Sequence, residues 1–509
     1  MKLPNLISTK NNQIKPIIWL GLIFILVFAV RLYIAFETPL LNYDAYFSLR
    51  QVEHIKDTGF PLYKDNLSYG GKMQLFAPLN HYIIAAFSFI MPIDVAGKVL
   101  PNLLAALIIF VVYYLSLKIT KNTKISLLTS FMSGFIPIYF IDINRVSINY
   151  LAVLLIFLII YCMLKLNEHK YVDYSLILMF LLVLTTPMAF VLIIGLLLYL
   201  VFLKLENFAI EMKELEIILF FTFLVFWVNL LIYKNAFLTH GLLVIWKNMP
   251  VQILANFFGN IGFIQALGAI SIIPIIFGVY AFYAAFHLDR SKEVLLLISV
   301  GLSAFILLWF KLLDIIDGFL FLGITLVILT AYSLKRFDDF LNKSKFHKYE
   351  KLITSLIIIL FIFTTLPPII YLVNNKDVGP LNTPSNSDIK VLTWAKEHLP
   401  ENASIACGLD EGNLVAYVAQ RKNIMDTNFL LIPRIDQRLK DLSEIYTTVF
   451  ETKATGILNQ YDSEYLLVTA NTLKEYNIEQ LKYLKNSNCF RLEYSNDDTY
   501  LYRLTCRLE

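Results

Sequence analysis

The sequence predicts a polytopic α-helical membrane protein that carries a small α/β domain at its carboxyl end. Hydrophobic residues make up 58% of the 509 residues and charged residues only 16%, a balance that water-soluble proteins of this size do not show. Apolar segments of about 20 residues recur from Pro16 to Val373 and then stop. We therefore expect a membrane domain over residues 1–373 and a second domain over residues 374–509.

Eleven membrane-spanning helices are expected in the first domain. The first span is long and has no small-residue cleavage site before Arg31, so we expect an anchor that is retained, unlike a signal peptide. The apolar segment Pro78–Pro92 would break the alternation of loops, and it is predicted to lie on the outer surface or to insert halfway. The predicted spans are 16–36, 95–117, 125–140, 148–166, 174–186, 188–205, 216–234, 261–286, 294–310, 318–334 and 352–373.

Basic residues gather in alternate loops, which orients the chain in the membrane. The richest loop, 335–351, carries six lysine and arginine residues, whereas the short loops on the other side carry only Arg145, Lys247 and Lys311. This asymmetry predicts a cytoplasmic N-terminus, with the first loop (37–92) and the C-terminal domain outside the cell membrane. The net charge of +4 is spread over short loops, so no nucleic-acid partner is expected.

Helical and strand patterns alternate in the C-terminal domain, which predicts a mixed α/β fold. The last two strands would form a hairpin that brings Cys489 near Cys506, and both a disulfide and two free thiols are compatible with this arrangement. Helices are expected at 388–399, 412–420, 435–450, 451–461 and 472–485, and strands at 403–408, 423–425, 464–469, 490–494 and 499–504.

Asp44 opens the long first loop, a few residues after the first span. A carboxylate at a membrane surface costs desolvation energy unless it faces water or a partner, so ionisable groups at this depth indicate functional sites. A helix predicted over Ala45–Lys56 favours an ordered loop, and Tyr69 precedes two glycines that allow a ligand to approach the backbone. The alternative is an ordinary solvated aspartate.

A second outer loop places Asp142 and Arg145 at about the same depth as Asp44. Two interpretations are open. Either the two charges of opposite sign in this loop form a simple salt bridge, or Asp44 and Asp142 serve the reaction while Arg145 binds phosphate. In the second case the two carboxylates bind a divalent cation such as Mg²⁺ or Mn²⁺, or they orient a nucleophile.

Several short segments resemble the catalytic subunit of oligosaccharyltransferases, within the GT-C type glycosyltransferases that use lipid-linked phosphosugars. In the outer loops they are Asn42-Tyr-Asp-Ala-Tyr-Phe-Ser-Leu-Arg50, Gly59-Phe-Pro, Ser68-Tyr-Gly-Gly71 and Asn144-Arg145. In the C-terminal domain, Gly408-Leu-Asp-Glu-Gly412 is similar to the region of that family's Trp-Trp-Asp-Tyr-Gly motif. The resemblance is weak but spans the whole chain.

The resemblance implies a membrane-embedded polyprenyl-phosphate or polyprenyl-diphosphate (dolichol-type) sugar donor and an inverting transfer to an extracytoplasmic acceptor. Asp44 then matches the catalytic aspartate, acting as general base or metal ligand, and Asp142 stands in for the second acidic motif. The expected contacts to the donor phosphate are Arg145, Lys311 and Lys72, and the expected contacts to the acceptor are Asp410 and Tyr69.

The departures from the family pattern restrict the acceptor. Gly408 and Leu409 replace the tryptophans that read the peptide sequon, and the outer loop 235–260 contains no acidic residue. We therefore expect a glycan, lipid or non-sequon protein acceptor. Ser147-Ile-Asn149 stands where the family has an acidic pair, which leaves metal dependence open.

Two other classes of function compete with an enzyme. A transporter or flippase would show inverted halves and charges near the bilayer midplane, whereas this chain gathers its ionisable groups at one face. A non-catalytic relative that binds glycans is compatible with the incomplete motifs.

Overall fold

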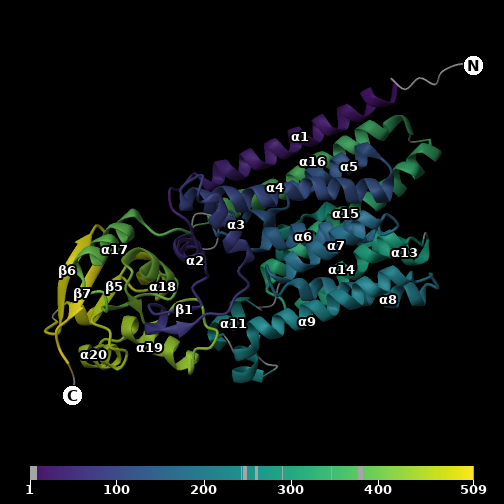
Figure 1. The fold of residues 1–509 in the computed structure, drawn as a ribbon. Helices are drawn as coiled ribbons and strands as arrows, with labels where there is room; N and C mark the ends of the chain where they lie inside the picture. The colour runs from purple at the N-terminus through teal and green to yellow at the C-terminus, as the bar shows by residue number, and fades with distance from the viewer. Residues whose placement is uncertain are drawn as a thin grey trace, which may run out of the picture.

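The computed structural model describes residues 8–241, 244, 249–257, 262–288, 290–345, 347–375, 382–485 and 487–507. A long bundle of helices forms one part of the molecule, and the C-terminal α/β domain sits at one end of it (Figure 1). The first loop, with helices α2 (Ala45–Thr58) and α3 (Leu79–Phe87), lies between the two parts. The N-terminal helix runs to the opposite end of the bundle.

Each of the eleven predicted spans coincides with a helix or a pair of helices. Six of the described helices are long and apolar enough to cross a membrane, or seven if the bent pair α12 and α13 forms one crossing. The protein is thus a multi-pass membrane protein, and the count of eleven stays a prediction. The helices are α1 (Ser8–Ala35), α4 (Ile93–Thr120), α5 (Thr123–Gly134), α6 (Asn149–Met163), α7 (His169–Val183), α8 (Ala189–Leu205), α9 (Met212–His240), α12 (Phe263–Ile270), α13 (Ile272–His287), α14 (Lys292–Trp309), α15 (Ile315–Lys343) and α16 (Glu350–Asn374).

Two of these predicted spans are broken. The prediction of one helix over 125–140 is wrong, because α5 ends at Gly134 and Pro137 begins a separate 3-10 turn. Helices α12 and α13 meet at an angle of 97° around Ser271. The φ of Ser271 is 89°, which is incompatible with a continuous α-helix. A short helix, α11 (Val251–Phe257), follows α9.

The fraction of buried residues in each helix shows which helices lie at the centre of the bundle and which lie at its edge. In the apolar window of α4, 72% of the residues are buried, against 22% in α1 and 17% in α16. Helix α4 therefore lies in the centre, and α1 and α16 lie at the periphery, with their apolar side chains exposed to the bilayer.

Helix α2 connects the first loop to the C-terminal domain. Its buried side chains Ala45, Leu49 and Val52 recur at helical spacing, so they form one apolar face. This face shares a hydrophobic cluster with Ile405 and Leu414 of the C-terminal domain. The helix predicted over 45–56 is confirmed, and α3 begins and ends within the predicted segment 78–92.

The C-terminal domain contains a five-stranded mixed sheet in the order β4-β3-β5-β7-β6. Strand β3 pairs in parallel with β4 and β5, whereas β7 pairs antiparallel with β5 and β6. Its elements are α17 (Asn386–His398), β3 (Ser404–Ala406), α18 (Gly412–Leu414), a π-turn (Val415–Ala419), β4 (Lys422–Asn423), α19 (Ile435–Thr447), α20 (Glu451–Gln460), β5 (Tyr465–Val468), α21 (Ala470–Glu475), β6 (Phe490–Asn496) and β7 (Thr499–Leu504).

Several elements of this domain differ from the prediction. The helix expected over 412–420 is the short α18 followed by a π-turn. The helix expected over 472–485 ends at Glu475, because Asn477 takes a left-handed φ of 51°. The strand expected over 423–425 begins one residue earlier and ends at Asn423. The hairpin of β6 and β7 forms as predicted, and Cys489 and Cys506 form a disulfide across its open end, which decides between the two thiol states.

Candidate functional site

Two outer loops meet at a cluster of charged side chains. The backbone N–H of Asn42 donates to the carbonyl of Asn144 at 3.1 Å, which holds the loops side by side. Arg145 then lies between two carboxylates, with its Nε 3.8 Å from Asp44 Oδ2 and its Nη1 3.4 Å from Asp142 Oδ1. The structure therefore brings together the three charged residues that the sequence analysis singled out.

Asp44 is the more accessible of the two carboxylates. It occupies the residue before α2, and its side chain is 48% exposed and caps no backbone N–H of the helix. Asp142 is only 4% exposed, and its Oδ2 accepts hydrogen bonds from Ser147 Oγ at 2.9 Å and Asn149 Nδ2 at 3.3 Å. Asp44 is thus open to a substrate proton, whereas Asp142 is held by protein donors.

A buried polar chain positions the loop that carries Asp142. Arg31, fully buried at the end of α1, donates from Nε to Asn102 Oδ1 at 3.0 Å and from Nη1 to the Tyr139 carbonyl at 2.7 Å. Asn102 Nδ2 in turn donates to the Ile143 carbonyl at 2.9 Å. This buried arginine, which sequence reasoning had considered only as a boundary, is a positioning residue for the site.

Asp314 is a further carboxylate at the site, and sequence reasoning missed it. It precedes α15 and accepts from the Ile316 N–H at 3.2 Å. Burial raises the pKa of Asp314 to about 6, and Asp142 adds to the rise while Arg145 opposes it. Two aspartates, 314 and 317, just where an apolar helix begins, were the signal available in the sequence. Lys311, in the same loop, is exposed and has a φ of 56°.

Asp410 of the C-terminal domain belongs to the same electrostatic cluster. Burial raises its pKa to about 6, with Asp44 adding to the rise and Arg145 lowering it. The turn that presents Asp410 requires glycine at 412, since a Cβ there would lie 2.1 Å from the Met425 carbonyl oxygen. Of the two predicted acceptor contacts, Asp410 is the one that lies with Asp44.

Glu411 holds this turn in place from behind. Its carboxylate accepts hydrogen bonds from Thr469, from Thr472 Oγ1 at 2.6 Å and from the Gly408 N–H at 3.0 Å. Burial nevertheless raises the pKa of Glu411 to about 7. The side chain therefore serves the local fold and faces away from the solvent.

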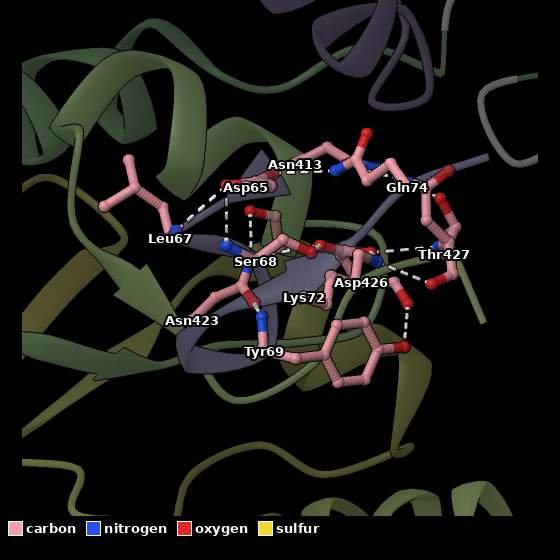
Figure 2. A network of polar contacts seen from close by, with 12 residues as sticks. Asp65, Leu67, Ser68, Tyr69, Lys72, Gln74, Asn413, Asn423, Asp426 and Thr427 are labelled. Carbon is pink, nitrogen blue, oxygen red and sulfur yellow. Dashed lines mark hydrogen bonds and ion pairs between the residues drawn. The ribbon is translucent and has the colours of Figure 1, made fainter. Parts of the chain in front are cut away.

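Tyr69 and Lys72 lie elsewhere, at the junction of the first loop with the C-terminal domain. Figure 2 shows Ser68, Tyr69 and Lys72 around Asp426. Lys72 Nζ donates to Asp426 Oδ1 at 3.1 Å and to the Asn428 carbonyl at 2.6 Å, and the Tyr69 hydroxyl donates to the Asp426 carbonyl at 2.5 Å. Burial lowers the pKa of Lys72, while Asp426 opposes the change. Protein partners thus occupy both residues.

Asp44 and Asp142 are the predicted ligands of a divalent cation. Within the described ranges, no three His, Cys, Asp or Glu side chains are arranged to hold one. Both carboxylates lie within 4 Å of the Arg145 guanidinium, and their binding of a metal ion stays a prediction. Part of the outer loop 235–260, including Lys247, lies outside the described residues.

No protein-family model and no curated protein matches the chain. Solved structures share its fold. The oligosaccharyltransferase AglB of Archaeoglobus fulgidus, in its apo form, superimposes with a TM-score of 0.68 at 13% identity and covers 95% of this chain and 74% of its own. ArnT from Cupriavidus metallidurans, bound to undecaprenyl phosphate, gives 0.59 at 10% identity and covers 96% of this chain and 97% of its own.

The mycobacterial arabinofuranosyltransferase AftD gives a TM-score of 0.59 at 12% identity, covering 95% of this chain and 40% of its own. At these identities the likeness establishes the fold alone. All three neighbours are GT-C glycosyltransferases, and the chain has the GT-C fold that its sequence motifs predicted.

Proposed function

We propose that the protein is a membrane glycosyltransferase that moves a sugar or glycan from a polyprenyl-phosphate or polyprenyl-diphosphate donor to an acceptor outside the cytoplasm. The observation that carries this proposal is the half-exposed Asp44 carboxylate beside Arg145, at the end of the bundle where the C-terminal domain packs. Neighbours of the same fold support the donor class, since AglB has been solved with dolichol-phosphate and ArnT with undecaprenyl phosphate.

The site offers a base and a cation for one displacement at the anomeric carbon. Asp44 takes the proton of the acceptor hydroxyl or amide while the acceptor atom bonds to the anomeric carbon. The bond from that carbon to the phosphate oxygen breaks, and Arg145 neutralises the charge left on the carrier phosphate. Attack opposite the leaving phosphate inverts the anomeric configuration.

Two independent observations support the proposed orientation. Basic residues concentrate in the loops of one side, which the positive-inside rule places in the cytoplasm. The Cys489–Cys506 disulfide lies in the C-terminal domain, and structural disulfides persist in oxidising compartments. Both observations support an extracytoplasmic site.

Sugar release from radiolabelled polyprenyl-phosphate and polyprenyl-diphosphate donors, by purified protein in lipid nanodiscs, tests the proposal. We expect Asp44→Asn to lower turnover by at least ~100-fold, the usual scale for a lost acid–base group. Asp57→Asn is the matched control, because Asp57 is exposed at the other end of the same helix α2.

Equal turnover in the wild type and Asp44→Asn would refute the role of Asp44. Carrier binding without any sugar release would favour the non-catalytic glycan-binding relative. Absence of both binding and release would favour a transporter.

A further inference from the structure

The guanidinium of Arg145 lies within 4 Å of two carboxylates, Asp44 and Asp142, and a third carboxylate, Asp314, contributes to its electrostatic environment. Asp44 precedes α2, Asp142 lies in the connection from α5 to α6, and Asp314 precedes α15. Burial alone would lower the pKa of Arg145, but Asp142, Asp44 and Asp314 outweigh that effect and raise it. Three acids thus share one fixed positive charge.

The remaining polar groups around Asp142 are hydrogen-bond donors. Ser147 Oγ and Asn149 Nδ2 both donate to Asp142 Oδ2, and Arg145 Nη1 contacts Oδ1. Divalent cations such as Mg²⁺ and Mn²⁺ need oxygen atoms that are free to coordinate. Both oxygens of this carboxylate already accept from protein groups, so a metal would have to displace them.

Arg145 itself keeps one donor available. Its Nε is buried and makes no hydrogen bond to any residue that the structure describes, although it lies 3.8 Å from Asp44 Oδ2. A buried donor without a partner is costly, and it is satisfied when a ligand supplies an acceptor oxygen. A phosphate oxygen has the negative charge that such a donor pairs with.

We propose that the Arg145 guanidinium occupies the position of a divalent cation at this site, so that the chain stabilises its leaving phosphate without a metal ion. The inference deepens the proposed function and rests on it for the identity of the leaving group. The cation position itself does not depend on that function, and it can be tested by binding alone.

Mn²⁺ binding to the full-length protein in nanodiscs, measured by electron paramagnetic resonance, tests the cation position. We expect wild-type protein to bind no Mn²⁺ at the site. Arg145→Ala removes the cation that Asp44 and Asp142 share, so we expect the variant to bind one Mn²⁺ between these two carboxylates. Adding Asp142→Asn to Arg145→Ala should abolish that binding.

Arg50→Ala is the matched control. Arg50 also lies in the first loop and pairs with Asp65 through two bonds of 2.7 Å, but with that single carboxylate. Its removal should therefore create no Mn²⁺ site. Gel filtration and thermal unfolding of each variant confirm that the comparison is made on folded protein.

Two results would overturn the inference. The first is Mn²⁺ binding by wild-type protein that Asp142→Asn abolishes, because the metal would then hold the position assigned to Arg145. The second is a folded Arg145→Ala protein that binds no Mn²⁺, because the carboxylates would then not form a cation position.

Wild-type turnover in EDTA, where sugar release is observed, should stay within twofold of its value with Mg²⁺. Failure to release sugar at all would refute the proposed function and leave the Mn²⁺ result interpretable.

Discussion

Asp44 and Asp410 are two carboxylates that separate domains present to the same arginine. The first belongs to the outer loop and the second to the turn after β3, and the charge of Asp44 adds to the raised pKa of Asp410. Their roles follow from their surroundings. Asp44 is close to Arg145 and half exposed, which suits a base, whereas burial keeps Asp410 protonated at acidic pH.

The pKa of Asp410 predicts a pH dependence for the use of the acceptor. Its value of about 6, above the ordinary 3.8, means that the negative form appears only as the pH rises through 6. If Asp410 binds the acceptor as a carboxylate, kcat/KM for the acceptor should rise through that pH. The rise should be absent in Asp410→Asn, measured with saturating donor from pH 4.5 to 8. An unchanged profile in the variant would refute this role.

At the scale of elements, the first loop is bound to the C-terminal domain by a buried ion pair. The Lys72 and Asp426 side chains are 4% and 1% exposed, and Ser68 and Tyr69 contact the same aspartate (Figure 2). Tyr69 also donates its backbone N–H to Asn423 Oδ1 at 2.8 Å. This junction fixes the position of the C-terminal domain, and hence of Asp410, relative to Asp44.

Removing one partner of this pair should destabilise the junction. Lys72→Ala leaves a buried carboxylate without its cation, which costs about 3 kcal/mol. We expect that loss in denaturant unfolding of the full-length protein. Lys64→Ala is the control, because Lys64 lies in the same segment and is exposed. Equal stability of the two variants would show that Lys72 contributes no such energy and would reopen its predicted contact with the donor phosphate.

The disulfide closes the hairpin of β6 and β7 at the edge of the sheet. It joins residues 17 positions apart. A cross-link that closes a loop of that size lowers the conformational entropy of the unfolded chain and so stabilises the folded state by about 3 kcal/mol. Replacing both cysteines with serine should lower the unfolding free energy by that amount without changing carrier binding. Reduced carrier binding in the folded variant would show that the hairpin contributes to the site.

At the scale of the whole molecule, the charge asymmetry predicts which side each part faces. Asp57 lies in the first loop and Lys345 in the basic loop that precedes α16, and both are exposed. A membrane-impermeant maleimide should label Asp57→Cys in intact cells and Lys345→Cys only after permeabilisation. The free cysteines Cys162 and Cys407 are buried and give a low background. The reverse labelling would invert the orientation.

The sequence predicted the elements better than their ends. The length of the apolar segments and the positions of the basic loops predicted a helix at every expected span. Both features can be read from the local sequence, because a bilayer requires apolar spans of a fixed length and basic residues on one side. The prediction of one helix over 125–140 is wrong because glycine and proline interrupt this apolar segment. Helix α5 ends at Gly134, and Pro137 begins a separate 3-10 turn. The helix expected over 472–485 ends early because Asn477 takes a left-handed conformation, which closes the helix with local hydrogen bonds.

By itself the sequence determined the membrane character, the two-part organisation, and the candidate residues Asp44, Asp142, Arg145 and Asp410. Only the tertiary structure decided which partners these residues have. It placed Arg145 between the carboxylates, added Asp314, and assigned Lys72 and Tyr69 to the junction. The physical reason is that the sign and type of a side chain are local properties, whereas its charge partners come from segments far apart in the chain.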